Sequence, residues 1–371
     1  MGLDDPCAAS DDLQARNFYL ACYAVSLVEG ETIQTKKVRY STLMGYIGQA
    51  VELHTQRNLP SPRSADIDFV RIITEAVRKY EKVPDRREMI HDAMYLEMVR
   101  LYKKYLPSDP DCLVVALCEW MFLGRYVGFR KSEWTHKHKT NFEKIDDPEW
   151  GDRPAALGLI LEDITFYSAS GRPVHVTKDM WHTRSLPTNF EYLKLRIRKQ
   201  KNNDNYQILT YHRVRNSYLC PVRAAFMIYC RARHLDLPTE HPVAIYRDAN
   251  SASRFQITGK DTNTFLRKIA SYLYDIPETS EDLKKWSTHS VRVTAANLLH
   301  RAKFSDSYIK NRLRWRSDTF LMYLRNTFHT AHDHSKAMDL EITPESTNMR
   351  PLEDHETMVA EIGATTATST C

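Results

Sequence analysis

The chain has 371 residues, of which 42% are hydrophobic and 27% are charged, and its formal net charge is +5. These proportions exclude a fully disordered chain, and the length favours two domains over one. The small positive charge permits a phosphate-bearing partner without requiring one. Seven cysteines without a CxxC pair favour neither a disulfide framework nor a zinc site, and they are typical of a reducing compartment.

Two stretches bear on secretion and membranes. Residues 1–12 are acidic and contain no apolar run, so we expect no secretory signal there. The most apolar run, residues 112–124, is interrupted by Glu119 and is too short to span a bilayer. We therefore expect a buried helix in this region and no contact with a membrane.

The first hundred residues predict helices joined by short connections. Apolar residues recur every three to four positions, and prolines lie between or after the periodic segments. The segments are residues 13–30, 41–58, 65–82 and 90–105. Together they predict a helical domain over residues 10–107.

The second half predicts a small sheet within a helical domain. A buried helix from Leu113 to about Phe129 leads into the sequence GFRKSEW. Apolar and polar residues then alternate in residues 157–168, 191–200 and 206–214, a pattern typical of strands. The intervening sequence KNNDN favours a hairpin turn, so we expect an antiparallel arrangement.

Helices resume after the sheet. A helix over residues 220–234 precedes a predicted loop at about 236–259. The later helices, with their predicted N-caps, are 263–276 (Asp261 or Thr262), 289–302 (Thr288), 306–313 (Ser305) and 319–327 (Ser317 or Asp318). The tail from about residue 340 is acidic and then rich in Thr and Ala, so we expect it to be loosely ordered.

Chemically distinctive residues follow one another along the second half. They are Arg130 in GFRKSE, a lysine beside the hairpin turn, His289 and Arg292 in HSVR, and Trp315 followed by Tyr323. His289 and Arg292 are one helical turn apart, so their side chains could converge on one anion. Each residue alone has a simpler explanation, such as a partner for a helix dipole or part of a core stripe. The ordered set favours a shared site.

In this order, the set resembles the tyrosine recombinases, the phage-integrase-like superfamily of DNA breaking and rejoining enzymes. The resemblance covers roughly residues 10–330, and HSVRVTAANLL with LRWRSDTFLMYLRNT is most similar to the Crypton-type recombinases of eukaryotic mobile elements. It implies a multi-domain, mainly α fold. The implied parts are a helical DNA-clamp (SAM-like core-binding) domain over 10–107, a mixed α/β catalytic domain with a small antiparallel sheet over 108–335, and a partly disordered tail over 336–371.

The resemblance implies a role for each residue of the set. Tyr323 would attack the scissile phosphate and form a covalent 3′-phosphotyrosine intermediate. Arg130 and Arg292 would hold that phosphate, since a guanidinium can donate two parallel hydrogen bonds to it. His289 and the Trp315 indole would donate to the same oxygens, and His289 could also accept the proton of the nucleophile.

The resemblance also implies a lysine that protonates the leaving 5′-hydroxyl. Lys199 and Lys201 both fit, and Lys201 is favoured because it directly precedes the turn residues Asn202 and Asn203. Glu133 is expected to support the arginines rather than to take part in the chemistry. Because the phosphotyrosine link retains the bond energy, we expect no ATP, metal or other cofactor.

The implied partner is double-stranded DNA, bound mainly through phosphates and therefore in a salt-sensitive manner. Relatives act as tetramers that exchange a C-terminal segment, so we expect a homo-tetramer on paired DNA sites, with residues 329–340 as the exchanged segment. The expected location is the nucleus in a eukaryote and otherwise the cytoplasm, on DNA. Two alternatives stay open: a type IB topoisomerase-like enzyme, and a recombinase-derived DNA-binding protein that no longer cuts.

Overall fold

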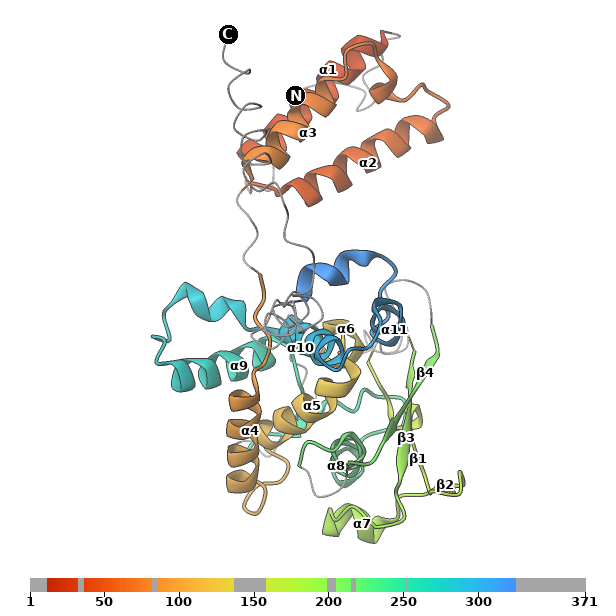
Figure 1. The fold of residues 1–371 in the computed structure, drawn as a ribbon, viewed down its shortest axis with the longest axis vertical. Helices are drawn as coiled ribbons and strands as arrows, with labels where there is room; N and C mark the ends of the chain where they lie inside the picture. Colours follow the sequence, from red (N-terminus) through yellow and green to blue (C-terminus); the bar gives the residue numbers. More distant parts are fainter. Residues whose placement is uncertain are drawn as a thin grey trace, which may run out of the picture. The chain divides into compact units, whose positions relative to one another are not determined.

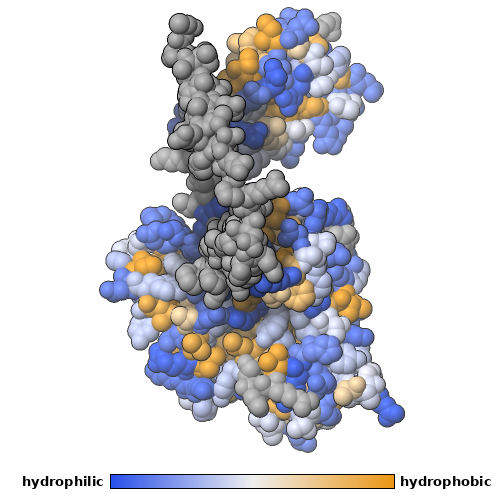
Figure 2. Space-filling model, in the orientation of Figure 1, coloured by the Kyte–Doolittle hydropathy of each residue, from blue (hydrophilic) through white to orange (hydrophobic). Residues whose placement is uncertain are grey.

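The computed structural model describes residues 12–32, 37–81, 86–136, 158–198, 205–214, 218–250 and 253–324. The chain forms two compact units, Met1–Asp85 and Arg86–Cys371. Both are built largely of helices (Figure 1), and the described side chains on the face of each unit that Figure 2 shows are mostly hydrophilic, with scattered apolar ones. No helix in the described ranges is both long and apolar enough to cross a membrane.

Unit 1 is a small helical bundle. Its elements are α1 (Leu13–Glu29), α2 (Tyr40–Gln56), the 3-10 turn η1 (Pro62–Ser64) and α3 (Phe69–Tyr80). The core contains Leu20, Ala24, Leu43, Ile47 and Val70. The buried Asn17 amide donates to the carbonyl of Pro62 at 2.9 Å and accepts from the backbone N–H of Phe69 at 2.8 Å. It thereby fixes the turn and the start of α3 onto α1.

Unit 2 surrounds a buried central helix, α5. The helices are α4 (Asp92–Tyr105), α5 (Leu113–Val127), α6 (Lys131–Trp134), α7 (Lys178–Thr183), α8 (Pro221–His234), α9 (Gly259–Tyr274), α10 (Thr288–Arg301) and α11 (Asp306–Arg312). The 3-10 turns are η4 (Leu161–Asp163), η5 (Glu281–Lys285) and η6 (Asp318–Tyr323). Helix α4 packs on α5, with the rings of Tyr102 and Phe122 5.7 Å apart. The units therefore divide at Asp85, ahead of the boundary predicted at residue 107.

The sheet of unit 2 lies beside α8 (Figure 1). Its strands are β1 (Ile164–Tyr167), β2 (Pro173–Val174), β3 (Tyr192–Ile197) and β4 (Gln207–His212), antiparallel in the order β2-β1-β3-β4. Leu193, Leu195 and Ile197 are buried, and the alternate residues of β3 are partly exposed. The prediction of a mainly helical chain with a small antiparallel sheet is confirmed.

A second, two-stranded sheet was not predicted. Strands β5 (Ile245–Arg247) and β6 (Arg254–Gln256) pair antiparallel in the region expected to be a loop, so that expectation was wrong. The short strands hold Ile245 and Gln256 in the interior, where burial rather than a sequence pattern determines their structure.

Buried ion pairs join α5, α7 and α8. Arg231 lies 2.5 Å from the Glu119 carboxylate, and Arg184 lies 2.5 Å from Asp111. Burial raises the pKa of Glu119, and the positive charge of Arg231 opposes that rise. Such charges can be buried because each has its partner, so removing one partner would be costly.

The segment that enters unit 2, residues 86–91, is bound along η5 and α10. The backbone N–H of Glu88 donates to the carbonyl of Lys285 at 3.0 Å, and that of Ile90 donates to the hydroxyl of Thr294 at 2.7 Å. The Trp286 indole donates to the carbonyl of Met89 at 3.3 Å. This segment therefore supports the helix that carries His289 and Arg292.

Candidate active site

The candidate site forms where the end of α5 meets the chain before η6. Helix α5 ends at Gly128, whose φ is +58° and whose carbonyl accepts from Arg292 at 3.0 Å. A Cβ at Gly128 would lie 2.7 Å from Leu313 Cδ2 and 3.0 Å from Ala295 Cβ. The absence of a side chain at Gly128 thus lets α10 and residue 313 approach the end of α5.

The buried side chain of Arg292 connects the end of α5 to the end of α11. The residue is 2% exposed, and its two terminal nitrogens donate to the carbonyls of Gly128 and Leu313. Its guanidinium carbon lies 4.3 Å from the ring centroid of Trp315, a cation–π contact. The predicted pair of Arg292 and Trp315 is therefore in direct contact.

Arg130 approaches the same backbone from α6. Its side chain is 18% exposed and donates to the Glu133 carboxylate at 3.3 Å and to the carbonyl of Arg314. Arg292 also donates to that carbonyl, at 3.4 Å. Two arginines from distant parts of the sequence thus meet at the residue preceding Trp315.

Arg314 is a site residue that sequence reasoning missed. Its side chain is 1% exposed and forms an ion pair with Glu133 at 2.7 Å. In the sequence it belongs to the basic run IKNRLRWRSD, in which a buried arginine looks like its solvated neighbours. Its adjacency to Trp315 was the available signal. We refer to Arg130, Arg292, Arg314 and Glu133 as the arginine cluster.

Glu133 supports the arginine cluster, as expected. Its buried carboxylate accepts from Arg130 and Arg314 and also from the backbone N–H of Arg130 at 2.9 Å. The arginine cluster contains three guanidinium groups and one carboxylate, so its formal charge is positive.

His289 lies in the first turn of α10, which is capped by Ser287. Burial, together with the positive charges of Arg292 and Arg87, lowers the pKa of His289 to about 4, and burial has the largest effect. The imidazole is therefore neutral at pH 7, the form that can accept a proton.

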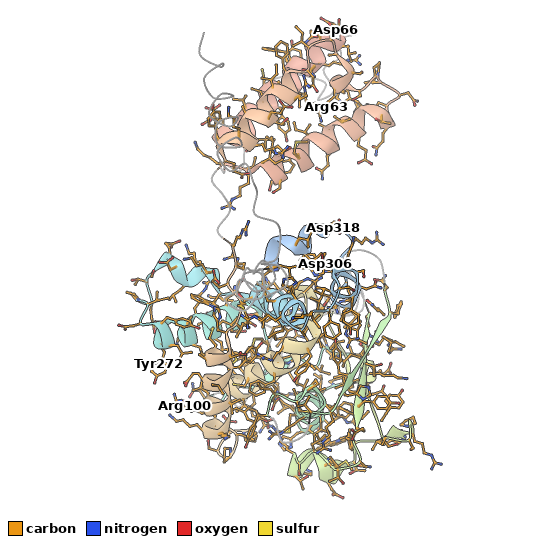
Figure 3. The ribbon with its side chains drawn as sticks, viewed as in Figure 1. Arg63, Asp66, Arg100, Tyr272, Asp306 and Asp318 are labelled. Atoms are coloured by element: carbon orange, nitrogen blue, oxygen red, sulfur yellow. The ribbon has the colours of Figure 1, made fainter. Side chains whose placement is uncertain are left out.

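The backbone of Tyr323 ends η6. Phe320 of this turn is 1% exposed and belongs to a cluster with Ala295 and Ala296 of α10. Asp318 forms an ion pair with Lys310 of α11 at 2.8 Å and is labelled above that helix in Figure 3. These contacts hold η6 near α10, although the position of the Tyr323 side chain is not described.

Several predicted features lie outside the described residues. They are Lys199, Lys201, residues 329–340 and the tail over 336–371. The structure thus brings together Arg130, Arg292 and Trp315 and places His289 one turn from Arg292 on α10. The tyrosine and lysine roles stay predictions.

No protein-family model matches the sequence, and no curated protein matches it. The solved structure of the Tn1549 transposon integrase in complex with circular intermediate DNA aligns with 87% of this chain and 86% of its own, at 11% identity and a TM-score of 0.40. The same integrase with transposon right end DNA aligns over 87% and 85%, at 11% identity and a TM-score of 0.42. The XerH site-specific recombinase bound to difH substrate aligns over 91% and 99%, at 10% identity and a TM-score of 0.36.

Proposed function

We propose that this chain is a site-specific DNA recombinase or integrase that cleaves and rejoins DNA through a covalent 3′-phosphotyrosine intermediate at Tyr323. The observation that carries the proposal is the convergence of Arg130 and Arg292 on the carbonyl of Arg314, beside Trp315. The order of short motifs in the sequence predicts the same three residues. The positive charge of the arginine cluster also favours an anionic ligand.

In the proposed reaction, the Tyr323 oxygen attacks phosphorus and the bond from phosphorus to the 5′-oxygen breaks. Arg130 and Arg292 stabilise the added negative charge on the non-bridging oxygens, with the Trp315 indole as a further donor. A preorganised donor of this kind typically contributes about 3 kcal/mol to transition-state stabilisation. Neutral His289 accepts the phenolic proton, and Lys201, or Lys199 in its place, protonates the leaving oxygen. Attack by a 5′-hydroxyl on the phosphotyrosine reverses these steps and frees Tyr323.

The proposed substrate is double-stranded DNA, held by a helical clamp domain and a catalytic domain. We assign the assembly to a homo-tetramer on paired sites, and the source to a Crypton-type transposable element acting on nuclear DNA. The sequence resemblance supports these assignments.

The first test is trapping of the covalent intermediate. The protein is incubated with duplexes that carry candidate element ends and either a nick or a 5′-bridging phosphorothiolate, in EDTA and without ATP. We expect a protein–DNA band on a denaturing gel, and its loss with Tyr323→Phe. Salt-sensitive DNA binding without an adduct on any substrate would instead favour the non-cutting protein.

The phosphorothiolate also identifies the general acid, because a thiolate leaves without needing a proton. Lys201→Ala should not cleave the ordinary nicked phosphodiester but should cleave the phosphorothiolate. Lys199→Ala should cleave both substrates. The reverse pattern would assign the role to Lys199. Relaxation of supercoils by a monomer at many sites, without strand exchange, would place the chain with the topoisomerase-like enzymes.

A further inference from the structure

A row of rings crosses the outer face of the sheet in unit 2. Tyr167 on β1, Tyr192 on β3 and His212 on β4 are register partners. The rings of Tyr167 and Tyr192 are parallel within 2°, with centroids 4.9 Å apart, and His212 follows 5.5 Å from Tyr192 at an angle of 41°. These residues alternate with the buried side chains that face the core. The row is therefore a ring stack on the solvent side of the sheet.

The ring stack ends at an accessible position. Strand β4 is the last strand of the sheet, and His212 is exposed there. The guanidinium of Arg312, on α11, donates to the β4 carbonyl of Thr210 at 2.6 Å and so ties this strand to the helix preceding Trp315. An aromatic ligand that stacks on His212 would thus lie beside α11, the helix that precedes Trp315.

One cation accompanies the rings. The Lys194 ammonium lies 4.6 Å from the centroid of the Tyr167 ring, and no carboxylate in the described ranges is within ion-pair distance of it. Farther along the sheet, Arg196 and Arg198 donate to Asp163 at 2.8 and 2.7 Å. The exposed Glu162 also lies 3.8 Å from each of these arginines. Among the described cations of β3 and residue 198, Lys194 is therefore the one beside the rings that no carboxylate offsets.

This combination matches an unpaired nucleic-acid strand. A free base has a π-face that can stack on an aromatic ring, and the adjoining phosphate can pair with a lysine. A duplex buries its base faces along its length and is bound through many cations, which this surface lacks. Cross-strand ring pairs also stabilise sheets, but that role does not require an exposed ring at the edge strand or a cation beside the stack.

We propose that this face binds single-stranded DNA, with bases stacking on the row of Tyr167, Tyr192 and His212 and a phosphate paired with Lys194. The choice of DNA rests on the proposed function, since breaking one strand of a duplex frees the bases beside the break. The surface would hold such bases while the strand is open.

The test is binding of fluorescein-labelled dT12 to the full chain, measured by fluorescence anisotropy. His212→Ala, at the exposed end of the row, should weaken binding about 10-fold, in the range found for loss of one base stack. Tyr192→Leu should weaken it at least as much, with circular dichroism confirming the fold. The control is Tyr272→Ala, which removes an aromatic ring that is 70% exposed on α9 (Figure 3) and should leave binding unchanged.

Salt dependence provides a second measurement. With one phosphate contact, the logarithm of the affinity should fall with the logarithm of salt concentration at a slope of about −0.7, and Lys194→Gln should flatten it. Equal dT12 affinities for the parent and His212→Ala, or a slope of several units, would overturn the proposal. Stronger competition by rU12 than by dT12 would overturn the choice of DNA.

Failure of this proposal is distinguishable from failure of the proposed function. Tyr323→Phe should abolish the covalent adduct and leave dT12 binding intact. If no adduct forms on any substrate while dT12 binding depends on His212, the proposed recombinase function is contradicted, and the proposed binding of single-stranded DNA to the ring stack is supported.

Discussion

At the residue scale, the arginine cluster depends on one carboxylate. Glu133 is buried and accepts from both Arg130 and Arg314, while Arg292 donates to carbonyl oxygens. A buried guanidinium without its acceptor carries a large desolvation cost. The side chain at position 133 therefore controls both the stability of unit 2 and the direction of Arg130.

Glu133→Gln should lower the free energy of unfolding of unit 2 by about 3 to 5 kcal/mol, because Arg314 would keep its charge in a buried place without the carboxylate. Urea denaturation measures this loss. The matched control is Arg100→Gln, which breaks an ion pair between Arg100 and Glu97 on the surface of α4 (Figure 3) and should leave the midpoint unchanged. Equal effects of the two substitutions would contradict a role for Glu133 as buried partner.

His289 makes stability depend on pH. In the unfolded chain its pKa is near 6.5, whereas in the folded protein it is about 4. The unfolded state therefore binds the proton first as pH falls from 6.5 to 4, so folding stability decreases through this window. Between pH 7 and pH 4 the free energy of unfolding of the unsubstituted protein should fall by about 3 kcal/mol more than that of His289→Gln, because glutamine cannot take up a proton. Parallel pH profiles for the two proteins would show that His289 does not titrate in this way.

At the element scale, the end of α5 is the point on which the site is assembled. Gly128→Ala should lower stability by about 1 to 3 kcal/mol, because a Cβ there would clash with Leu313 and the backbone has a positive φ. It should also reduce adduct formation, since the Gly128 carbonyl orients Arg292. The control is Gly45→Ala within α2, where the added Cβ would have no atom within 4 Å apart from its chain neighbours and the backbone of its own helix. That change should be neutral or slightly stabilising, and thermal unfolding compares the two.

The elements that the sequence predicted well are those with a strong local pattern. The helices of unit 1 and α4 follow three-to-four spacing, α5 follows from its continuous apolar run, and Ser305 caps α11 as expected. At α9 the predicted cap was wrong: Thr258 is the N-cap, and Asp261 is the residue that completes its capping box. Likewise, Ser287 rather than Thr288 caps α10. A polar residue in the first turn of a helix can be either the cap or its partner, and composition does not distinguish them.

The site was predictable where residue type dictates the chemistry. Arg130, Arg292 and Trp315 are predicted because the order of their motifs resembles that of the tyrosine recombinases, and because guanidinium and indole N–H groups can donate to a phosphate. Arg314 was not, because its burial and its φ of +61° arise from packing against Glu133 and the end of α5. Local sequence does not encode a tertiary contact of that kind.

At the scale of the whole molecule, the two units have separate cores. Leu43→Ala in unit 1 should lower the stability of that unit by about 2 to 5 kcal/mol, since Leu43 is 0% exposed. We expect calorimetry to show one of two transitions shifted and the other unchanged. Leu266→Ala, in the core of unit 2, should shift the other transition. A single transition that moves with both substitutions would mean that the units unfold together.

The segment over residues 86–91 also determines where the chain can be joined to part of another protein in a chimaera. Since Glu88, Met89 and Ile90 are hydrogen-bonded to η5 and α10, they belong structurally to unit 2 although they precede its first helix. A chimaera that grafts a foreign DNA-binding module onto residue 92 would discard these bonds, whereas a junction at residue 86 would keep them. The useful boundary for building such chimaeras is thus six residues ahead of α4, in a stretch with no regular secondary structure.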